Sequence, residues 1–207
     1  MVFQMQRQNI IKKTITSYDK TAQEYASTHL DITPIKQLID EFIKNLNGKN
    51  ILDVGCGTGR DVKYFLEQGL NPIGIDLSKN LLEIALKNVP NAHFLEMDMR
   101  DLTFQKEQFD GIWACASFLH LPKTEAKIAL NQFFKVLKPK GLLSISVKSG
   151  IGERFVKKKE YKGFSKFYSF YSQQEIKELI SSQGFKIEKI AIDHKKEDWI
   201  NIFAIKT

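Results

Sequence analysis

Three glycines follow one predicted strand, and carboxylates lie near the ends of this strand and the next. The strand predicted over 50–54 contains Asp53 and runs into Gly55, Gly57 and Gly59. Glycines between a buried strand and a helix let the backbone turn tightly, and a ligand can approach the amide groups without meeting a Cβ. Asp76 ends the next predicted strand, about 20 residues beyond the glycines, where such folds accept hydrogen bonds from ribose hydroxyls. This arrangement predicts a site for a nucleotide-type ligand.

The glycine spacing narrows the class of ligand. The glycines read GxGxG, whereas dinucleotide oxidoreductases have GxGxxG, a spacing that brings a pyrophosphate close to the helix amides. A pyrophosphate ligand is therefore disfavoured. A third predicted strand is followed by Asp98, and Met97 and Met99 beside it could sandwich a purine. Three acids at three consecutive strand ends form one constellation.

Short apolar runs alternate with segments of helical period, which is typical of a parallel sheet with helices between its strands. The sequence predicts strands over 50–54, 72–75, 92–95, 110–114 and 141–147, and helices over 58–68, 78–88, 123–137 and 172–183. Two further strands, 185–192 and 198–206, are joined by the short polar segment 193–197 and must be antiparallel. The predicted fold is an α/β, Rossmann-like, doubly wound sheet of seven strands that ends in an antiparallel hairpin.

The length of 207 residues, with 43% hydrophobic and 27% charged residues, is typical of one globular domain. We expect a single domain over 1–207: a helical cover over 1–47, a Rossmann-like core over 48–207, and a lid-like insertion over 148–171. No apolar run approaches the roughly 18 to 20 residues that a membrane span needs. Polar residues near the amino terminus and only two cysteines favour a cytoplasmic protein.

The net charge of +7 is concentrated in one stretch. Residues 135–166 contain ten Lys and Arg but only two acidic residues, a local charge of +8. Seven aromatic residues lie between Phe155 and Tyr171. Such a segment could bind an acidic small molecule or stack bases and hold phosphates, and it could equally be a solvated loop whose aromatics cover the sheet edge.

Five ordered motifs resemble those of the class I S-adenosylmethionine-dependent methyltransferases, and the resemblance extends from about residue 10 to the end of the chain. The motifs are DVGCGTG (53–59), GIDLS (74–78), MDMRDL (97–102), FDGIWACASFLHLP (109–122) and VLKPKGLLSISV (136–147). The resemblance implies the same fold and S-adenosyl-L-methionine as the cofactor, with S-adenosyl-L-homocysteine as its product. The fourth motif lacks the Asn-Pro-Pro-Tyr type of sequence, which disfavours relatives that methylate amino groups of adenine or glutamine.

The resemblance also implies roles for individual residues. Asp53, Gly55 and Gly57 would line the methionine part of the cofactor, and Asp76 would bind the ribose. Asp98 would meet the adenine amine, Leu77 and Met99 would flank the ring, and Ala114 and Cys115 would pass beneath the sulfonium. Tyr18 and Tyr25 would close over the cofactor, although their seven-residue spacing on one helical face equally suits two core residues.

His120 follows the fourth strand, where the methyl acceptor should arrive. Its ordinary pKa of about 6.5 suits a general base, but a structural role is the alternative. Cys115 is better explained as inert packing than as a nucleophile. The four histidines show no ligand spacing, so we expect no metal site.

Three functions remain open on the sequence. The first is methyl transfer to a small organic acceptor, including a carboxylate held by the basic segment 152–171. The second is a tRNA wobble-uridine carboxymethyl methyltransferase, which Lys166-Phe167-Tyr168-Ser169-Phe170 and Asp198-Trp199 resemble. The third is a cofactor-binding scaffold without catalysis. The sequence leaves the oligomeric state undetermined and predicts no membrane partner.

Overall fold

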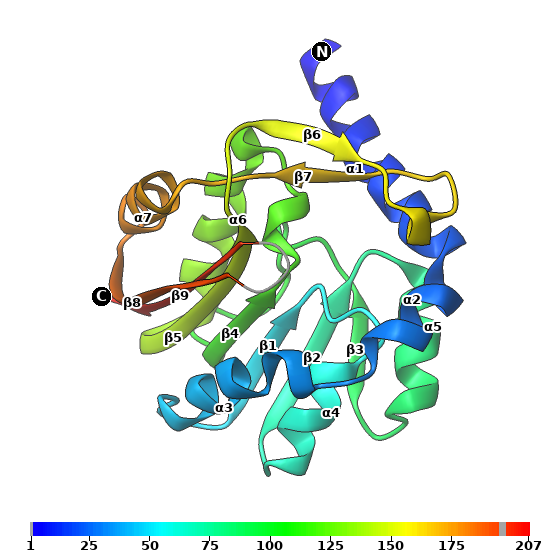
Figure 1. The fold of residues 1–207 in the computed structure, drawn as a ribbon. Coiled ribbons are helices and arrows are strands. Elements are labelled where there is room, and N and C mark those ends of the chain that lie inside the picture. The colour runs from blue at the N-terminus through cyan, green and yellow to red at the C-terminus, as the bar shows by residue number, and fades with distance from the viewer. Residues whose placement is uncertain (1, 195–197) are drawn as a thin grey trace.

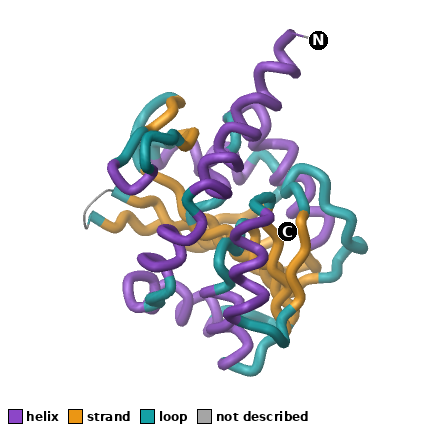
Figure 2. Tube along the Cα trace, turned by 90° about the vertical axis from the view of Figure 1, so that its right-hand side faces the viewer, coloured by secondary structure: helices purple, strands orange, loops and turns teal. Residues whose placement is uncertain are grey.

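A sheet with helices on both faces forms the body of the protein (Figures 1 and 2). The computed structural model describes residues 2–194 and 198–207. Residues 195–197, part of the predicted polar link between the last two strands, lie outside the described residues. In the described part of the chain, no helix combines the length and the apolar character needed to cross a membrane.

The sheet has seven strands in the order β3-β2-β1-β4-β5-β9-β8. Strands β1 to β5 pair in parallel, whereas β9 pairs antiparallel with both β5 and β8. The strands are β1 (Asn50–Val54), β2 (Asn71–Asp76), β3 (His93–Glu96), β4 (Phe109–Cys115), β5 (Leu137–Lys148), β8 (Phe185–Asp193) and β9 (Trp199–Lys206). The predicted doubly wound sheet with an antiparallel terminal hairpin is confirmed. Strand order reverses between β1 and β4, where open α/β sheets form a ligand crevice at their carboxyl ends.

Strand β5 is longer than predicted. It begins at Leu137, directly after helix α6 (Lys123–Val136), and not at residue 141, because Leu137 already pairs with Phe109 of β4 ahead of an irregularity in the pairing. The apolar run 141–147 marked only the central part of this strand.

Alternate residues of the central strands point to opposite faces of the sheet, so two separate layers of core form. On one face, Trp113 packs against aromatic rings from α3 and α4, at 5.0 Å from Phe42 and 6.0 Å from Phe65 between ring centroids. On the other face, Ile112 belongs to the cluster that includes Phe133 of α6. The helices are α3 (Lys36–Lys44), α4 (Arg60–Glu67), α5 (Lys79–Asn88), α6 (Lys123–Val136) and α7 (Gln173–Ser181).

Side-chain caps begin two of these helices at the predicted residues. The Ser78 hydroxyl accepts a hydrogen bond from the Leu81 amide at the start of α5, and the Ser172 hydroxyl accepts one from the Glu175 amide at the start of α7. Each cap satisfies an amide that has no partner within the helix.

The amino-terminal helices cross the carboxyl edge of the sheet (Figure 1). They are α1 (Val2–Lys20) and α2 (Ala22–His29), followed by the short 3-10 helix η1 (Thr33–Ile35). The helix is interrupted at Thr21. Tyr18 and Tyr25 therefore lie on two separate helices, and not on one helical face as predicted. Their rings still meet edge to face, with centroids 5.5 Å apart.

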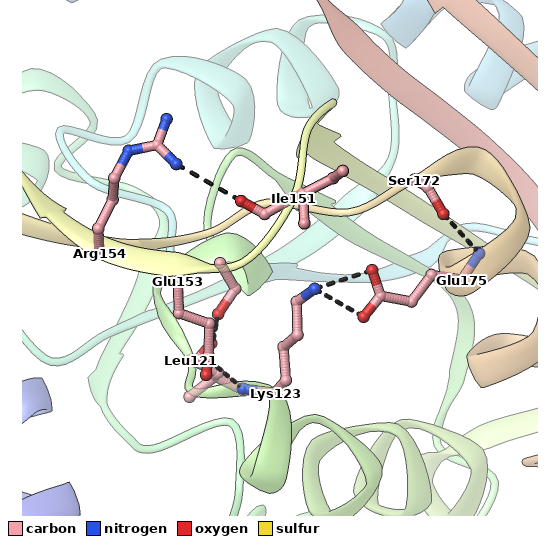
Figure 3. A network of polar contacts seen from close by, with 8 residues as sticks. Leu121, Lys123, Ile151, Glu153, Arg154, Ser172 and Glu175 are labelled. Atoms are coloured by element: carbon pink, nitrogen blue, oxygen red, sulfur yellow. Dashed lines mark hydrogen bonds and ion pairs between the residues drawn. The ribbon is translucent and has the colours of Figure 1, made fainter.

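Residues 153–169, which we call the β6–β7 ribbon, roof the same edge of the sheet. The ribbon consists of β6 (Glu153–Val156), η3 (Lys159–Tyr161) and β7 (Lys166–Ser169), with β6 and β7 forming a separate antiparallel pair that the sequence did not predict. The Phe167 amide donates to the Thr14 hydroxyl of α1 over 3.1 Å, and Glu153 accepts from the Lys123 amide over 2.6 Å (Figure 3). The ribbon is thereby tied to α1 on one side and to the start of α6 on the other.

Candidate functional site

A cavity lies at the carboxyl ends of β1, β2 and β4, beneath α1 and the short 3-10 helix η2 (Phe118–His120). Ten of the predicted site residues line it: Tyr18, Tyr25, Gly55, Gly57, Asp76, Leu77, Asp98, Met99, Cys115 and His120. The structure therefore brings together side chains from five separate parts of the chain. Asp53 and Ala114 are buried but are not on the cavity wall.

The glycine loop has the tight turn that its sequence predicts. Gly55 and Gly57 have positive φ angles of 73° and 55°, which favour glycine. The amides of Gly55 and Cys56 both donate to the Ile75 carbonyl of β2, over 2.8 and 3.0 Å. A Cβ on Gly57 would lie 3.6 Å from the Tyr25 ring. The loop thus presents bare backbone to the cavity.

Asp76 has hydrogen-bonding capacity left for a ligand. One of its oxygens accepts from the Gly57 amide over 2.9 Å, and the other accepts from the Ser78 amide over 2.8 Å. A carboxylate can accept about four hydrogen bonds, so Asp76, which lines the cavity, has acceptor capacity beyond these two bonds. Burial raises the pKa of Asp76, and the backbone amides of Ser78, Gly57 and Leu77 offset only part of this effect.

Asp53 is 2% exposed, and its Oδ2 atom has no hydrogen-bond partner among the described residues. Burial, followed by repulsion from Asp61, raises the pKa of Asp53 well above its ordinary value. A buried carboxylate oxygen without a donor is costly, so its position behind the glycine loop suits a ligand that brings a cation or a donor.

Asp98 lines the cavity but is already paired. Its carboxylate accepts hydrogen bonds from Arg100, whose guanidinium also donates to Glu125 of α6 over 2.7 Å. This network was not predicted from the sequence, because the contact between Arg100 and Glu125 spans 25 residues. Arg100 donates to both Asp98 oxygens through its main-chain amide and its guanidinium, so Asp98 has little hydrogen-bonding capacity left for a ligand.

Tyr18 and His120 form the polar group opposite the three strand ends. The Tyr18 hydroxyl lies 2.8 Å from His120 Nε2, and His120 Nδ1 lies 2.6 Å from the Phe167 carbonyl of the β6–β7 ribbon. Burial, with a smaller contribution from the nearby cations Lys166 and Lys148, lowers the pKa of His120 to about 4, and the hydrogen bond to the Phe167 carbonyl partly opposes this shift. The ring is therefore neutral at neutral pH and a weak general base.

We expect the His120→Gln variant to lose less stability than the wild type on acidification. Since the pKa in the folded state lies below its ordinary value of 6.5, the unfolded chain takes up a proton first as the pH falls from 6.5 towards 4. The wild type should therefore lose about 1 to 2 kcal/mol more than the variant between pH 7.5 and pH 5. Urea unfolding at both pH values measures this difference. His93→Gln, at an exposed histidine, controls for the loss of a histidine; equal losses in His120→Gln and wild type would contradict the prediction.

The predicted basic wall does not form at the cavity. Lys166 is 2% exposed, and its ammonium lies 3.5 Å from the Tyr18 ring centroid and 4.3 Å from that of Tyr161. Lys162 pairs with Glu24 of α2, and the Arg154 guanidinium stacks on Phe170. Most aromatics of the segment are buried, and these three cations contact rings or a carboxylate of the protein, an arrangement that spacing alone does not reveal.

Several residues that line the cavity were not predicted from the sequence, among them Ile11, Thr14, Ile15, Ser117 and Leu121. Ile11, Thr14 and Ile15 precede Tyr18 at helical spacing, so one face of α1 could have been predicted from that period.

Cys115 lies on the wall, and burial raises its pKa to about 12, so its thiol stays protonated at neutral pH. Within residues 2–194 and 198–207, no cluster of three or more His, Cys, Asp or Glu side chains could hold a metal ion.

Comparisons with known proteins point to one family. Residues 51–141 match the family model described as a methyltransferase domain. The putative methyltransferase YqeM of Bacillus subtilis is 38% identical over 104 residues, covering 48% of this chain and 42% of that protein. A ubiquinone biosynthesis O-methyltransferase of Pasteurella multocida is 29% identical over 161 residues, covering 67% of this chain and 65% of that protein. The matches thus span less than two thirds of either relative.

A solved structure shares the whole fold. The 1,6-didemethyltoxoflavin-N1-methyltransferase of Burkholderia thailandensis has a TM-score of 0.73 and covers 95% of this chain and 88% of its own, at 20% identity. That structure contains 1,6-didemethyltoxoflavin and S-adenosylhomocysteine. At this level of identity, the likeness shows that the two proteins have the same fold.

Proposed function

We propose that the chain is a class I S-adenosylmethionine-dependent methyltransferase, which transfers a methyl group from this cofactor to a small organic acceptor. The observation that carries the proposal is the pairing of the glycine loop with Asp76 at the switch point of the sheet, facing an open cavity.

The residues present fit the cofactor. The free lone pairs of Asp76 can accept from two ribose hydroxyls, and the bare backbone of Gly57 leaves room beside them. The unpartnered Oδ2 of Asp53 suits the ammonium of the methionine part. Asp53 is not itself on the cavity wall, so this contact would need the glycine loop to move aside. Leu77 and Met99 offer apolar surface to the adenine, and Asp98 would accept from its amine in exchange for one of its hydrogen bonds with Arg100.

S-adenosylmethionine supplies a methyl group that is activated by a positively charged sulfur. The chain contributes mainly by aligning the acceptor and excluding water, since the transfer is a direct displacement. Helix α1 and the β6–β7 ribbon cover the site for this purpose, and their link through Thr14 and Phe167 keeps them together.

The names of two relatives support an acceptor of small size. One is a methyltransferase of ubiquinone biosynthesis, and the other acts on 1,6-didemethyltoxoflavin. The cavity wall includes Cys115, Tyr18 and His120 as well as the glycine loop, so we expect an acceptor to bind beside the cofactor in the same cavity, as catalysis requires and a binding scaffold does not.

Calorimetry with S-adenosylmethionine and S-adenosylhomocysteine tests this proposal. We expect saturable binding of both at one site per chain, and release of S-adenosylhomocysteine when an acceptor is present. No binding of either compound would contradict the proposed function, and binding with turnover of no small molecule would favour the scaffold.

The tRNA alternative predicts salt-sensitive binding through the exposed cations of the ribbon. Lys157 and Lys159 are exposed, so phosphates could reach them. We expect that reversing the charges of Lys157, Lys158 and Lys159 together leaves cofactor affinity intact and changes turnover only modestly, because three consecutive residues cannot all face one small pocket.

A gel shift with bulk tRNA at about 50 and 200 mM salt, alongside turnover of the triple variant, measures this. Tight binding that weakens steeply with salt and is abolished by the triple reversal would replace the small acceptor with tRNA. Reversal of Lys63, Lys87 and Lys127, on other helices, is the matched control for net charge.

A further inference from the structure

The acceptor side of the cavity is mostly apolar. Helix α1 contributes Ile11 and Ile15, and the segment after β4 contributes Leu121, opposite the strand ends that face the cofactor. Among the side chains that the structure describes, no Lys or Arg lines the cavity. A carboxylate acceptor would therefore lose its water shell without meeting a cationic side chain on the wall, which is costly.

The hydrogen bonds at this end of the cavity have a fixed direction. The Phe167 carbonyl can only accept, so His120 Nδ1 must carry the proton of their 2.6 Å contact. A neutral imidazole with a proton on Nδ1 has a lone pair on Nε2. The Tyr18 hydroxyl, 2.8 Å from Nε2, must then be the donor of that hydrogen bond.

The Tyr18 hydroxyl thus donates its proton to His120, and only the lone pairs of its oxygen remain for a ligand. Three other hydroxyls on the wall are committed in the same way, because Thr14 donates to the Ile10 carbonyl, Ser117 to the Val54 carbonyl and Ser78 to the Asp19 carboxylate. The Tyr25 hydroxyl lies at the glycine-loop end, near Gly57. At the acceptor end, the wall therefore offers hydrogen-bond acceptors.

Tyr18 is also held firmly in place. Its ring lies under the Lys166 ammonium at 3.5 Å and meets the His120 ring edge to face, with centroids 5.4 Å apart. A hydroxyl oxygen in a fixed position can select ligands by hydrogen-bond polarity as well as by shape.

We propose that the methyl acceptor is a neutral molecule whose O–H or N–H group donates a hydrogen bond to the Tyr18 oxygen, and that carboxylates are rejected. This inference rests on the proposed function and names the class of its substrate. Tyr18 acts in it as a specificity-determining residue, oriented by His120 and the Phe167 carbonyl of the ribbon.

Three small probes test the polarity directly: phenol donates a hydrogen bond, anisole has the same ring without the donor, and benzoate is an anion. Their dissociation constants are measured by NMR titration of the protein saturated with S-adenosylhomocysteine. We expect phenol to bind about tenfold more tightly than anisole, and benzoate to bind more weakly than phenol. In Tyr18→Phe, phenol and anisole should bind within about twofold of each other.

Tyr161→Phe is the matched control, since it removes a tyrosine hydroxyl that bonds to Tyr168 outside the cavity wall. It should keep the preference for phenol, whereas a general loosening of the ribbon would reduce the preference in both variants. Benzoate binding as tightly as phenol, no detectable phenol binding, or an unchanged preference in Tyr18→Phe would each overturn the inference. If S-adenosylhomocysteine itself fails to bind, the proposed function fails; if it binds without a preference for phenol, only this inference fails.

Discussion

Asp76→Ala is expected to weaken the binding of S-adenosylmethionine by about 1.5 to 3 kcal/mol, or roughly 10- to 150-fold in Kd. Two ribose hydroxyls would lose a charged acceptor in a buried site, where no water can fully replace it. The variant also removes the acceptor of the Gly57 amide, so the glycine loop loses one of the bonds that shape it. Calorimetry on the folded variant measures the loss.

Glu96→Ala is the matched control for this prediction. Glu96 ends the neighbouring strand β3, is exposed, and pairs with Lys79 at 3.4 Å outside the cavity. Its removal should leave the Kd within about twofold, because exposed ion pairs contribute little. Unchanged affinity in Asp76→Ala, with Glu96→Ala also unchanged, would refute the assignment of Asp76 to the ribose.

Gly55→Ala is expected to destabilise the fold strongly. The new Cβ would lie 2.3 Å from the Cβ of Ser117, and Gly55 has a φ of 73°. Ser117 cannot move aside freely, since its hydroxyl donates to the Val54 carbonyl over 2.5 Å. We expect a loss of about 3 to 5 kcal/mol in the free energy of unfolding, from backbone strain and overpacking together.

Gly69→Ala separates these two causes. Gly69 has almost the same φ, 74°, but no atom lies within 4 Å of the position of an added Cβ. It should lose only about 1 to 2 kcal/mol, the cost of the left-handed backbone alone. Urea unfolding of both variants gives the difference; equal losses would show that Ser117 yields and that the clash is not what makes Gly55 necessary.

Local patterns in the sequence were sufficient to predict the seven-stranded sheet and about half of the residues that line the cavity. Strand runs, the caps Ser78 and Ser172, and the glycine loop depend on residues within a few positions of one another, so their spacing reveals them. The carboxyl ends of parallel strands meet at one edge by topology, and this places Asp76 and Asp98 together before any side chain is known.

Only the tertiary structure decided the acceptor side of the cavity. Tyr18 and His120 are 102 residues apart, and the carbonyl that orients His120 belongs to a ribbon whose strand pairing the sequence did not predict. The sequence shows that Lys166 is a cation but not whether it is buried. Its burial depends on the rings of Tyr18 and Tyr161, which only the fold brings to its ammonium. Sequence period determines which face of an element is buried, whereas the polarity of a hydrogen bond depends on which donor meets which acceptor across the fold.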